Sequence, residues 1–133
     1  MTIRFFIPMK IPSKTAQEKK ITVRNGRPLL YTPPELVELK SKYISLLSEY
    51  APVTPIESAV MLRTTWIYQM GDKREIGEYK TTKPDTDNMI KLFKDAMTDA
   101  GFWLDDAQVA VEMTEKRYGP YEGVYVIVEE LRE

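Results

Sequence analysis

Residues 85–100 constrain the fold more than any other stretch, because their apolar side chains recur at helical spacing. At about 100° per residue, one arc of this predicted helix is apolar and comprises Met89, Ile90, Phe93, Ala96, Met97 and Ala100. The opposite arc is polar and comprises Asp87, Asn88, Lys91, Lys94 and Asp95. Asp85 occupies the N-cap position, and Gly101 supplies the C-terminal stop. Such a helix must bury its apolar arc, so the chain needs a sheet or a second helix to cover it.

A second helix and several strands are expected around this one. Thr32 can cap a helix in which Pro33 takes the first position and Glu35 completes a capping box. Apolar residues then continue at helical spacing as far as Tyr50. Alternating or β-rich runs predict strands over residues 2–8, 21–24, 56–69, 108–117 and 124–128.

Turn signals organise these elements into one domain. Asn25-Gly26 predicts a tight hairpin turn, and Pro28 keeps the returning strand short or at an edge. Gly119-Pro-Tyr-Glu-Gly123 predicts a turn that would pair the last two strands as a hairpin. The polar stretches 13–20 and 71–82 are expected to be loops. Together these signals predict a single α+β domain over residues 1–133, with two main helices on a mixed or mostly antiparallel sheet.

The lack of histidine and cysteine limits the chemistry available to this chain. A hydrolytic site would have to use carboxylates, lysines and a metal ion, and aspartates suit a hard divalent cation such as Mg²⁺. A chain without cysteine also fits a reducing compartment. No apolar run approaches the roughly 20 residues of a membrane span. The expectation is a soluble, cytoplasmic protein with no membrane partner.

The segment Lys83-Pro-Asp-Thr-Asp-Asn-Met-Ile-Lys91 concentrates acids and lysines where the central helix begins. Taken singly, Asp85 can be explained as a helix cap and Asp87 as the i,i+4 partner of Lys91. Asp105-Asp106 can likewise be explained as a turn. Taken together, these acids exceed what one helix cap needs, and they suit a metal site.

Two familiar binding loops can be excluded at this segment. An EF-hand loop that starts at Asp85 would place Ile90 at its glycine position and Ala96 at its closing glutamate position. The sequence also lacks a Gly-x-x-x-x-Gly-Lys phosphate loop. We therefore expect neither an EF-hand calcium site nor a nucleotide cofactor.

Basic residues gather in two stretches although the net charge is only −1. The first stretch has a single acid, Glu18, among Lys10, Lys14, Lys19, Lys20, Arg24 and Arg27. The second, residues 72–94, mixes basic residues with the acids. A basic side beside a carboxylate cluster would suit a phosphate backbone that approaches a metal, although solvated surface charge explains the composition as well.

Several motifs occur in an order and at a spacing that resemble one family. They are Lys83-Pro-Asp-Thr-Asp-Asn-Met-Ile-Lys91, Asp95-Ala-Met, Asp105-Asp-Ala-Gln-Val109 and Glu115-Lys-Arg117. Residues 27–33 also resemble an upstream pattern of the same family. The resemblance is to the RusA family of Holliday junction resolvases, small nucleases common in bacterial prophages. It is close over residues 83–117 and looser near the N-terminus, where Lys14 follows Pro12-Ser13 although family members often have asparagine there.

The resemblance implies a RusA-like fold and specific roles. Asp85, Asp87 and Asp106 would be the catalytic acids that bind the metal, and Lys91 would be the essential lysine. The protein would be a homodimer that requires Mg²⁺ or Mn²⁺ and cuts opposed strands of a four-way DNA junction by paired symmetric nicks. Because a charged lysine is a poor metal ligand, Lys91 would stabilise charge on the phosphate or orient the nucleophile. Asp95 could hold Lys91 in place.

Other residues are expected to support the site or to contact DNA. The supporting residues are Asn88, Asp95 and Asp105. The candidate phosphate contacts are Lys83, Lys94, Lys116, Arg117, Lys14, Arg24 and Arg27.

The position of Asp106 creates a geometric tension. The central helix separates its ends by roughly 20 Å. Asp106 comes only five residues after Gly101, a reach of about 17 Å when the chain is extended. To meet Asp85, either residues 102–105 run back along the helix, or the helix stops early, or Asp106 joins the site of a partner subunit. We expect the site to be formed within one chain.

Three functions are compatible with this acidic cluster. The leading hypothesis is a metal-dependent, structure-selective DNA endonuclease that acts on four-way junctions in recombination and repair. A non-catalytic module of the same fold would bind branched DNA without cutting it. A small-molecule phosphohydrolase would use the same acids on nucleotides but not on junctions.

Overall fold

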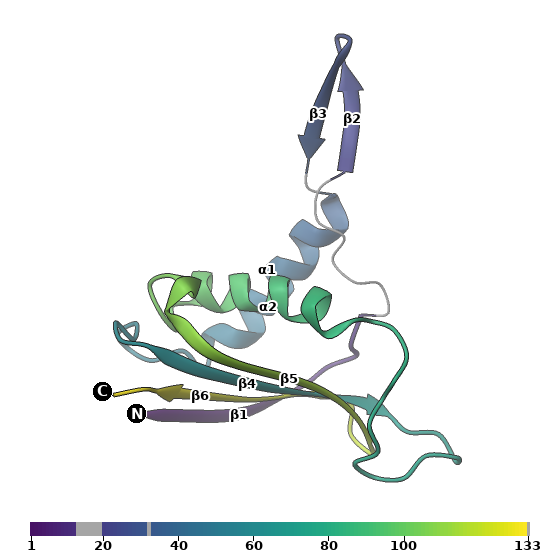
Figure 1. The fold of residues 1–133 in the computed structure, drawn as a ribbon, viewed down its shortest axis with the longest axis vertical. Coiled ribbons are helices and arrows are strands. Elements are labelled where there is room, and N and C mark those ends of the chain that lie inside the picture. Colours follow the sequence, from purple (N-terminus) through teal and green to yellow (C-terminus); the bar gives the residue numbers. More distant parts are fainter. Residues whose placement is uncertain (13–19, 32, 133) are drawn as a thin grey trace.

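A computed structural model shows the arrangement of the chain and describes residues 1–12, 20–31 and 33–132 (Figure 1). In chain order the elements are β1 (Thr2–Pro8), β2 (Lys20–Arg24), β3 (Arg27–Tyr31), α1 (Pro34–Ser48), β4 (Val60–Gln69), α2 (Thr86–Ala100), the 3₁₀ turn η1 (Asp106–Gln108), β5 (Val109–Gly119) and β6 (Gly123–Glu130).

A four-stranded mixed sheet forms the centre of the fold, with strand order β1-β6-β4-β5. β6 is antiparallel to both of its neighbours, whereas β4 and β5 are parallel. Parallel strands need a crossover connection, and α2 supplies it between β4 and β5. The predicted α+β architecture, with two main helices and a mixed sheet, is confirmed.

The predicted pairing of the last two strands is wrong. β4 lies between β5 and β6, so these two strands, although joined by a short turn, are not neighbours in the described sheet. The reason lies in burial. β4 has Val60, Leu62 and Trp66 fully or almost fully buried, and a central place in the sheet covers such a strand on both sides. Sequence alternation identifies a strand but does not identify its neighbour.

Both helices lie on one face of the sheet, and the core forms between them (Figure 1). Phe93 of α2 packs edge-on against Trp66 of β4, with ring centroids 5.2 Å apart. The same ring packs edge-on against Tyr43 of α1 at 5.1 Å. Phe93 is fully buried, so it is the point at which both helices and the sheet meet.

α2 begins and ends where the sequence predicts. Asp85 is the N-cap in an extended conformation, and Gly101 is the C-cap with φ 94°. This left-handed conformation suits glycine, which has no Cβ to clash. The buried side chains of the helix are Met89, Ile90, Phe93, Ala96 and Met97. The predicted apolar arc is therefore the one that packs on the core, and the polar arc faces away from it.

α1 and β4 each begin later than predicted. Pro33 takes the N-cap position of α1 and Pro34 the first helical position, where a missing N–H costs nothing. Thr32, the predicted cap, lies outside the described residues. β4 begins at Val60, because Ile56 instead forms an isolated parallel bridge with Trp103. In the described part of the chain, no helix is long and apolar enough to span a membrane.

β2 and β3 form a separate two-stranded sheet, as the sequence predicts. Asn25 and Gly26 make the turn with φ of 52° and 73°, the positive values that a tight hairpin turn needs. Figure 1 shows this hairpin projecting beyond α1, away from the four-stranded sheet. Most of the predicted loop over 13–20 falls outside the described residues.

The C-cap of α2 offers a test of this fold. We expect Gly101→Ala to lower the free energy of unfolding by about 1–2 kcal/mol, because alanine is strained in the left-handed region. An added methyl at Gly101 would meet nothing within 4 Å, so backbone strain alone sets the loss. Gly71→Ala is the control, since Gly71 has equal space and no positive φ. Equal losses in urea unfolding of the two variants would contradict the assigned cap.

Candidate active site

Two of the predicted acids lie at the N-terminal end of α2. Asp85 is the N-cap, yet within the described residues its carboxylate accepts no capping hydrogen bond. Both of its oxygens instead accept from the ammonium of Lys83, at 3.1 and 3.2 Å. The Asp85 side chain is 52% exposed, so it remains accessible to a further ligand. Asp87 follows in the first helical turn and is exposed, whereas Asn88 is half-buried.

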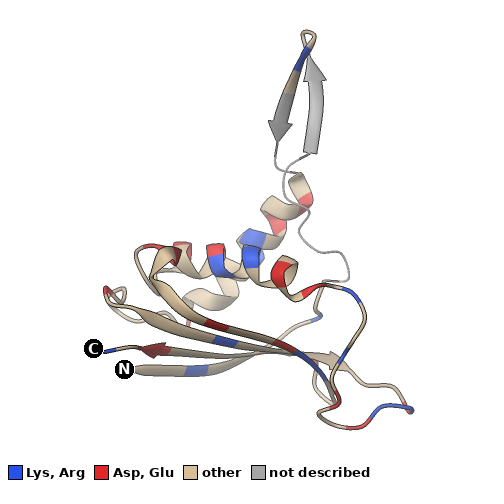
Figure 2. Cartoon of the chain, viewed as in Figure 1, with Lys and Arg blue, Asp and Glu red and all other residues tan. Residues whose placement is uncertain are grey.

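The polar arc of α2 continues the site away from this end. Asp87, Lys91 and Asp95 follow one another at intervals of one turn, and all three are exposed. Figure 2 shows the acidic N-terminal end of α2 next to basic turns of the same helix. Lys94 also lies on this arc, and its ammonium pairs with Glu112 of β5 at 2.8 Å. The N-terminal half of α2 thus presents carboxylate and ammonium groups side by side.

Lys116 of β5 holds the segment that leads into α2. Its ammonium donates to the carbonyl oxygens of Thr82 and Pro84, at 2.7 Å each. Hydrogen bonds from a charged donor are stronger than neutral ones. Pro84 immediately precedes Asp85, so β5 positions the backbone of the candidate site directly.

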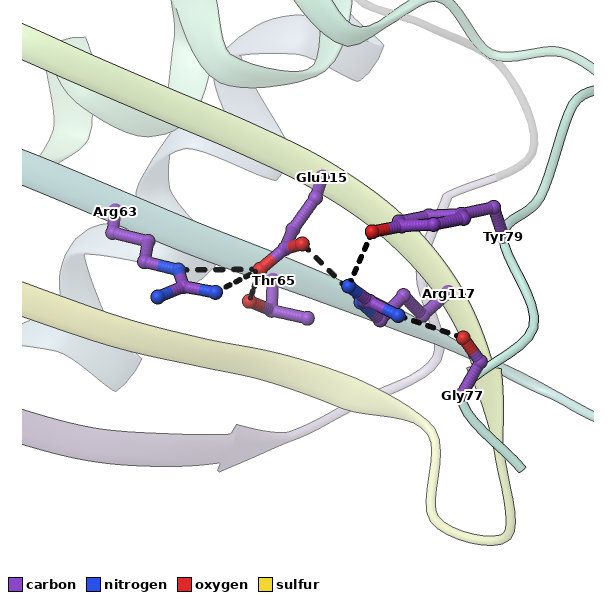
Figure 3. Close-up of polar contacts among 6 residues, drawn as sticks. All are labelled: Arg63, Thr65, Gly77, Tyr79, Glu115 and Arg117. Atoms are coloured by element: carbon purple, nitrogen blue, oxygen red, sulfur yellow. Dashed lines mark hydrogen bonds and ion pairs between the residues drawn. The ribbon is translucent and has the colours of Figure 1, made fainter.

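Arg117 holds the same segment from the opposite face of β5 (Figure 3). Its guanidinium donates to the carbonyl of Gly77 at 2.8 Å and to the hydroxyl of Tyr79 at 2.7 Å. It also lies 4.0 Å from the centroid of the Tyr79 ring, a cation–π contact. The predicted loop over 71–82 is therefore tied to the sheet edge in its second half.

Glu115 anchors Arg117 from within the sheet. Its carboxylate accepts from Arg117 at 3.2 Å, and from Arg63 and Thr65 at 2.8 Å each (Figure 3). Burial raises the pKa of Glu115, but the hydrogen bonds from Arg63, Thr65 and Arg117 outweigh it and lower the pKa overall. The network couples β4 and β5 to the segment that approaches the site.

Asp106 lies at the other end of α2. The helix continues to Ala100 and spans 15 residues, a length of about 22 Å. Buried Phe102 and Trp103 follow, and Asp106 then opens η1. Asp105 caps η1: its carboxylate accepts from the backbone of Ala107 at 2.9 Å. The turn predicted for this acidic pair is thus present, as a 3₁₀ turn.

The single chain does not bring the three predicted acids together. In the ranges 1–12, 20–31 and 33–132, no group of three acidic residues could hold a metal ion. The helix does not stop early, and residues 102–105 lead into η1 rather than back along α2. The expectation of a site formed within one chain is therefore not met. Asp85 and Asp87 lie together, and Asp106 lies apart from them.

The candidate phosphate contacts fall into three groups. Lys83 is 83% exposed beside Asp85, and Arg27 is exposed on the projecting hairpin. Lys94, Lys116 and Arg117 already bind groups of the protein. Arg24 lies in β2, and Lys14 lies outside the described residues.

Similarity to known proteins decides the family. Residues 3–129 match the family described as endodeoxyribonuclease RusA. The chain belongs to the RusA family. It is also 35% identical over 48 residues to a crossover junction endodeoxyribonuclease rusA of Lactococcus phage r1t. That alignment covers 36% of this chain and 37% of the phage protein, so it spans just over a third of each.

The RusA resemblance located the segment Glu115–Arg117 but not its contacts. Sequence reasoning gave Lys116 and Arg117 to phosphate and left Arg63 and Thr65 without a role. One signal was present: both strands place polar side chains at alternate positions. Only the register of the parallel pair, in which Thr65 lies opposite Glu115, turns that signal into a network.

The lowered pKa of Glu115 predicts a pH dependence of stability. Because the folded pKa lies below the unfolded value, this carboxylate contributes stability above the unfolded pKa and loses it as the pH falls through the folded pKa. We expect Glu115→Gln to destabilise the protein by about 1–3 kcal/mol at neutral pH. The gap between wild type and variant should shrink below about pH 4.5, the ordinary value for the group.

Urea unfolding at several pH values measures this gap. The control is Glu57→Gln, which changes an exposed acid outside the strands and should shift stability by less than about 0.5 kcal/mol. A gap that stays constant from neutral to acid pH would contradict the role assigned to the Glu115 carboxylate.

Proposed function

We propose that this RusA-family protein is a divalent-metal-dependent endonuclease that resolves four-way DNA junctions by paired symmetric nicks, in recombination and repair. The observation that carries the proposal is the pair of exposed acids at the start of α2, Asp85 and Asp87. They lie within the segment that most closely resembles the family motif. The crossover-junction name of the phage r1t relative supports branched DNA as the substrate class.

The donor set at this end of α2 fits Mg²⁺ or Mn²⁺. Hard cations prefer carboxylate oxygens, and the Asp85 carboxylate is exposed and unused as a cap within the described residues. Asp85 and Asp87 would hold the ion together with Asp106. When bound, such an ion lowers the pKa of a water ligand and offsets charge on the phosphate oxygens.

Lys91 would act on the substrate and not on the ion. It lies one turn after Asp87 on the exposed arc, where an ammonium can stabilise the charge that develops on a phosphate. Asp95 lies one further turn along and would orient Lys91. Exposed Lys83 would meet the DNA backbone as it approaches the acids.

A second copy of the chain would supply the third acid. One helix of about 22 Å separates Asp85 from Asp106 within the chain. Under twofold symmetry, a contact of one copy's Asp106 with the other copy's Asp85 occurs twice. Two sites related in this way suit two symmetric cuts in opposed strands.

One observation favours the alternative of a binding module. Over the described residues, no three acids converge to hold a metal. A module that binds branched DNA without cutting it needs no such convergence. The two functions part in a cleavage assay, because the module would bind junctions and leave them intact with every divalent ion.

The first prediction concerns Asp87. On a synthetic four-way junction with Mg²⁺, we expect paired symmetric nicks that EDTA abolishes and that linear duplex does not show. Asp87→Asn should reduce the cleavage rate more than about 100-fold, the loss typical of a group that stabilises transition-state charge. Binding of the junction, measured by gel shift, should survive.

The matched control is Asp99→Asn. Asp99 lies on the same helix at its far end, where it pairs with Lys40 on the surface at 2.9 Å. This variant should cut at the wild-type rate. Loss of binding together with cutting in Asp87→Asn would count against the assigned role, and cutting of nucleotides but not junctions would favour a phosphohydrolase.

Mixed dimers test whether two chains build each site. Asp87→Asn and Asp106→Asn should each be inactive as pure proteins. When they are co-expressed with different tags and the mixed dimer is isolated, one of its two sites would contain only unchanged acids. We expect this mixed dimer to nick one strand of the junction at about half the wild-type turnover. A site formed within one chain predicts no activity in any combination.

A further inference from the structure

β5 is an edge strand, and the second half of its outer side is occupied by the chain itself. Lys80 donates its backbone N–H to the carbonyl of Lys116 at 3.0 Å. Tyr118 donates its own N–H to the carbonyl of Glu78 at 2.8 Å. Lys116 and Tyr118 therefore direct their backbone groups outward, away from β4.

The first half of the same edge is open. Backbone direction alternates along a strand, so Glu112 and Thr114 also direct N–H and C=O outward. Gly119, at the alternate parity, accepts from Met70 on the inner side at 3.1 Å, as this alternation requires. Among the residues that the structure describes, no backbone group meets the outward groups of Glu112 and Thr114.

The open half also exposes two large apolar side chains. Val111 and Met113 are 49% and 52% exposed. They alternate with Glu112, which points to the helix face and pairs with Lys94 there. Cross-strand apolar pairs stabilise a sheet, and a long apolar edge is a template for another strand. The open half of β5 thus offers both backbone groups and side chains to a partner strand.

The opposite edge of the sheet, β1, is protected. Glu130 donates to the carbonyl of Met1 at 2.9 Å, and Met9 donates to the carbonyl of Glu122 at 3.3 Å. Odd-numbered residues of β1 therefore bond to β6, and even-numbered residues face outward. Pro8 occupies one of these outward positions and has no N–H to donate. The two edges of the sheet are not equivalent.

We propose that the open half of β5 pairs with the β5 of a second copy of this chain, antiparallel about a twofold axis at Glu112. This centre uses the whole stretch 110–114 and stops short of Lys116, whose carbonyl is already taken. It places Val111 of each copy opposite Met113 of the other. The second copy is the occupant that fits, because the same short stretch presents matching groups to itself.

Electrostatics at the axis are compatible with this pairing. The two Glu112 side chains would lie opposite each other, and like charges in that position are unfavourable. Each Glu112 brings its own Lys94 partner at 2.8 Å, so each half contributes a neutral pair. α2 lies over β5, so the two helices would also come close and enlarge the interface.

The pairing deepens the proposed function, and its catalytic consequence rests on that function. About an axis at Glu112, Asp106 of one copy comes opposite Tyr118 of the other. Tyr118 lies beside the segment 77–84 that Lys116 ties to the start of α2. The register therefore carries the distant acid of one copy toward the end of α2 that bears Asp85 in the other.

Single cysteines test the register cleanly, because the chain has none of its own. Val111→Cys and Met113→Cys proteins, co-expressed with different tags, should form a disulfide between unlike chains on mild oxidation. Directly opposed residues without ladder bonds lie about 4.5 Å apart at Cα, within disulfide reach. Each variant alone should cross-link at least about tenfold less, since its two cysteines would lie about 7–8 Å apart.

A proline substitution tests the interface without the cysteines. Glu112→Pro removes only an outward N–H, so the β4–β5 ladder should stay intact while dimerisation weakens at least tenfold, by about 1.4 kcal/mol. Arg4→Pro is the matched control, because it removes an outward N–H from β1. Sedimentation equilibrium gives the dimer constants, and circular dichroism checks that both variants fold.

The outcomes separate the interface from the function. A dimer that persists unchanged in Glu112→Pro, or that cross-links in no mixture, overturns the β5 pairing even if it cuts junctions. Cross-links confined to the Val111 and Met113 mixture support the pairing, even if no metal supports cleavage. In that second case the proposed nuclease function fails and the interface stands.

Discussion

The parallel pairing of β4 and β5 is the constraint on which the rest of the molecule depends. Two strands that run in the same direction require a connection that returns along the length of the sheet, and α2 is that return. The helix therefore starts at one end of the sheet and finishes at the other. Asp85 and Asp106 inherit these two ends, and their separation is a property of the topology rather than of any side chain.

The same edge strand also controls the approach to the candidate site. Lys116 and Arg117 are adjacent in β5, so their side chains project to opposite faces. Each grips the segment before α2, one near Pro84 and the other near Gly77. Charges that look available for a phosphate backbone are spent on positioning. DNA contact then falls to exposed residues such as Lys83 and the projecting hairpin.

Local signals made much of the fold predictable. The bounds of α2 follow from its arc of apolar residues and from Gly101, and the β2–β3 turn follows from Asn25-Gly26. Strand order was not predictable, because alternation in β5 and β6 is equally satisfied by a hairpin and by two separated strands. The same limit applies to the site. The acids at the start of α2 were identifiable from spacing, but their distance from Asp106 and the Glu115 network depend on which strands are neighbours.

Pro8 has a consequence for how large an assembly of this sheet can become. A sheet with two open edges has no natural end, and repeated addition at both edges leads to fibres. Here a proline faces outward on β1, and the chain's own residues 77–80 cover part of β5. Addition can proceed at one short stretch and then stops. The molecule therefore has the geometry of a self-limiting assembly, in which growth ends after a single step.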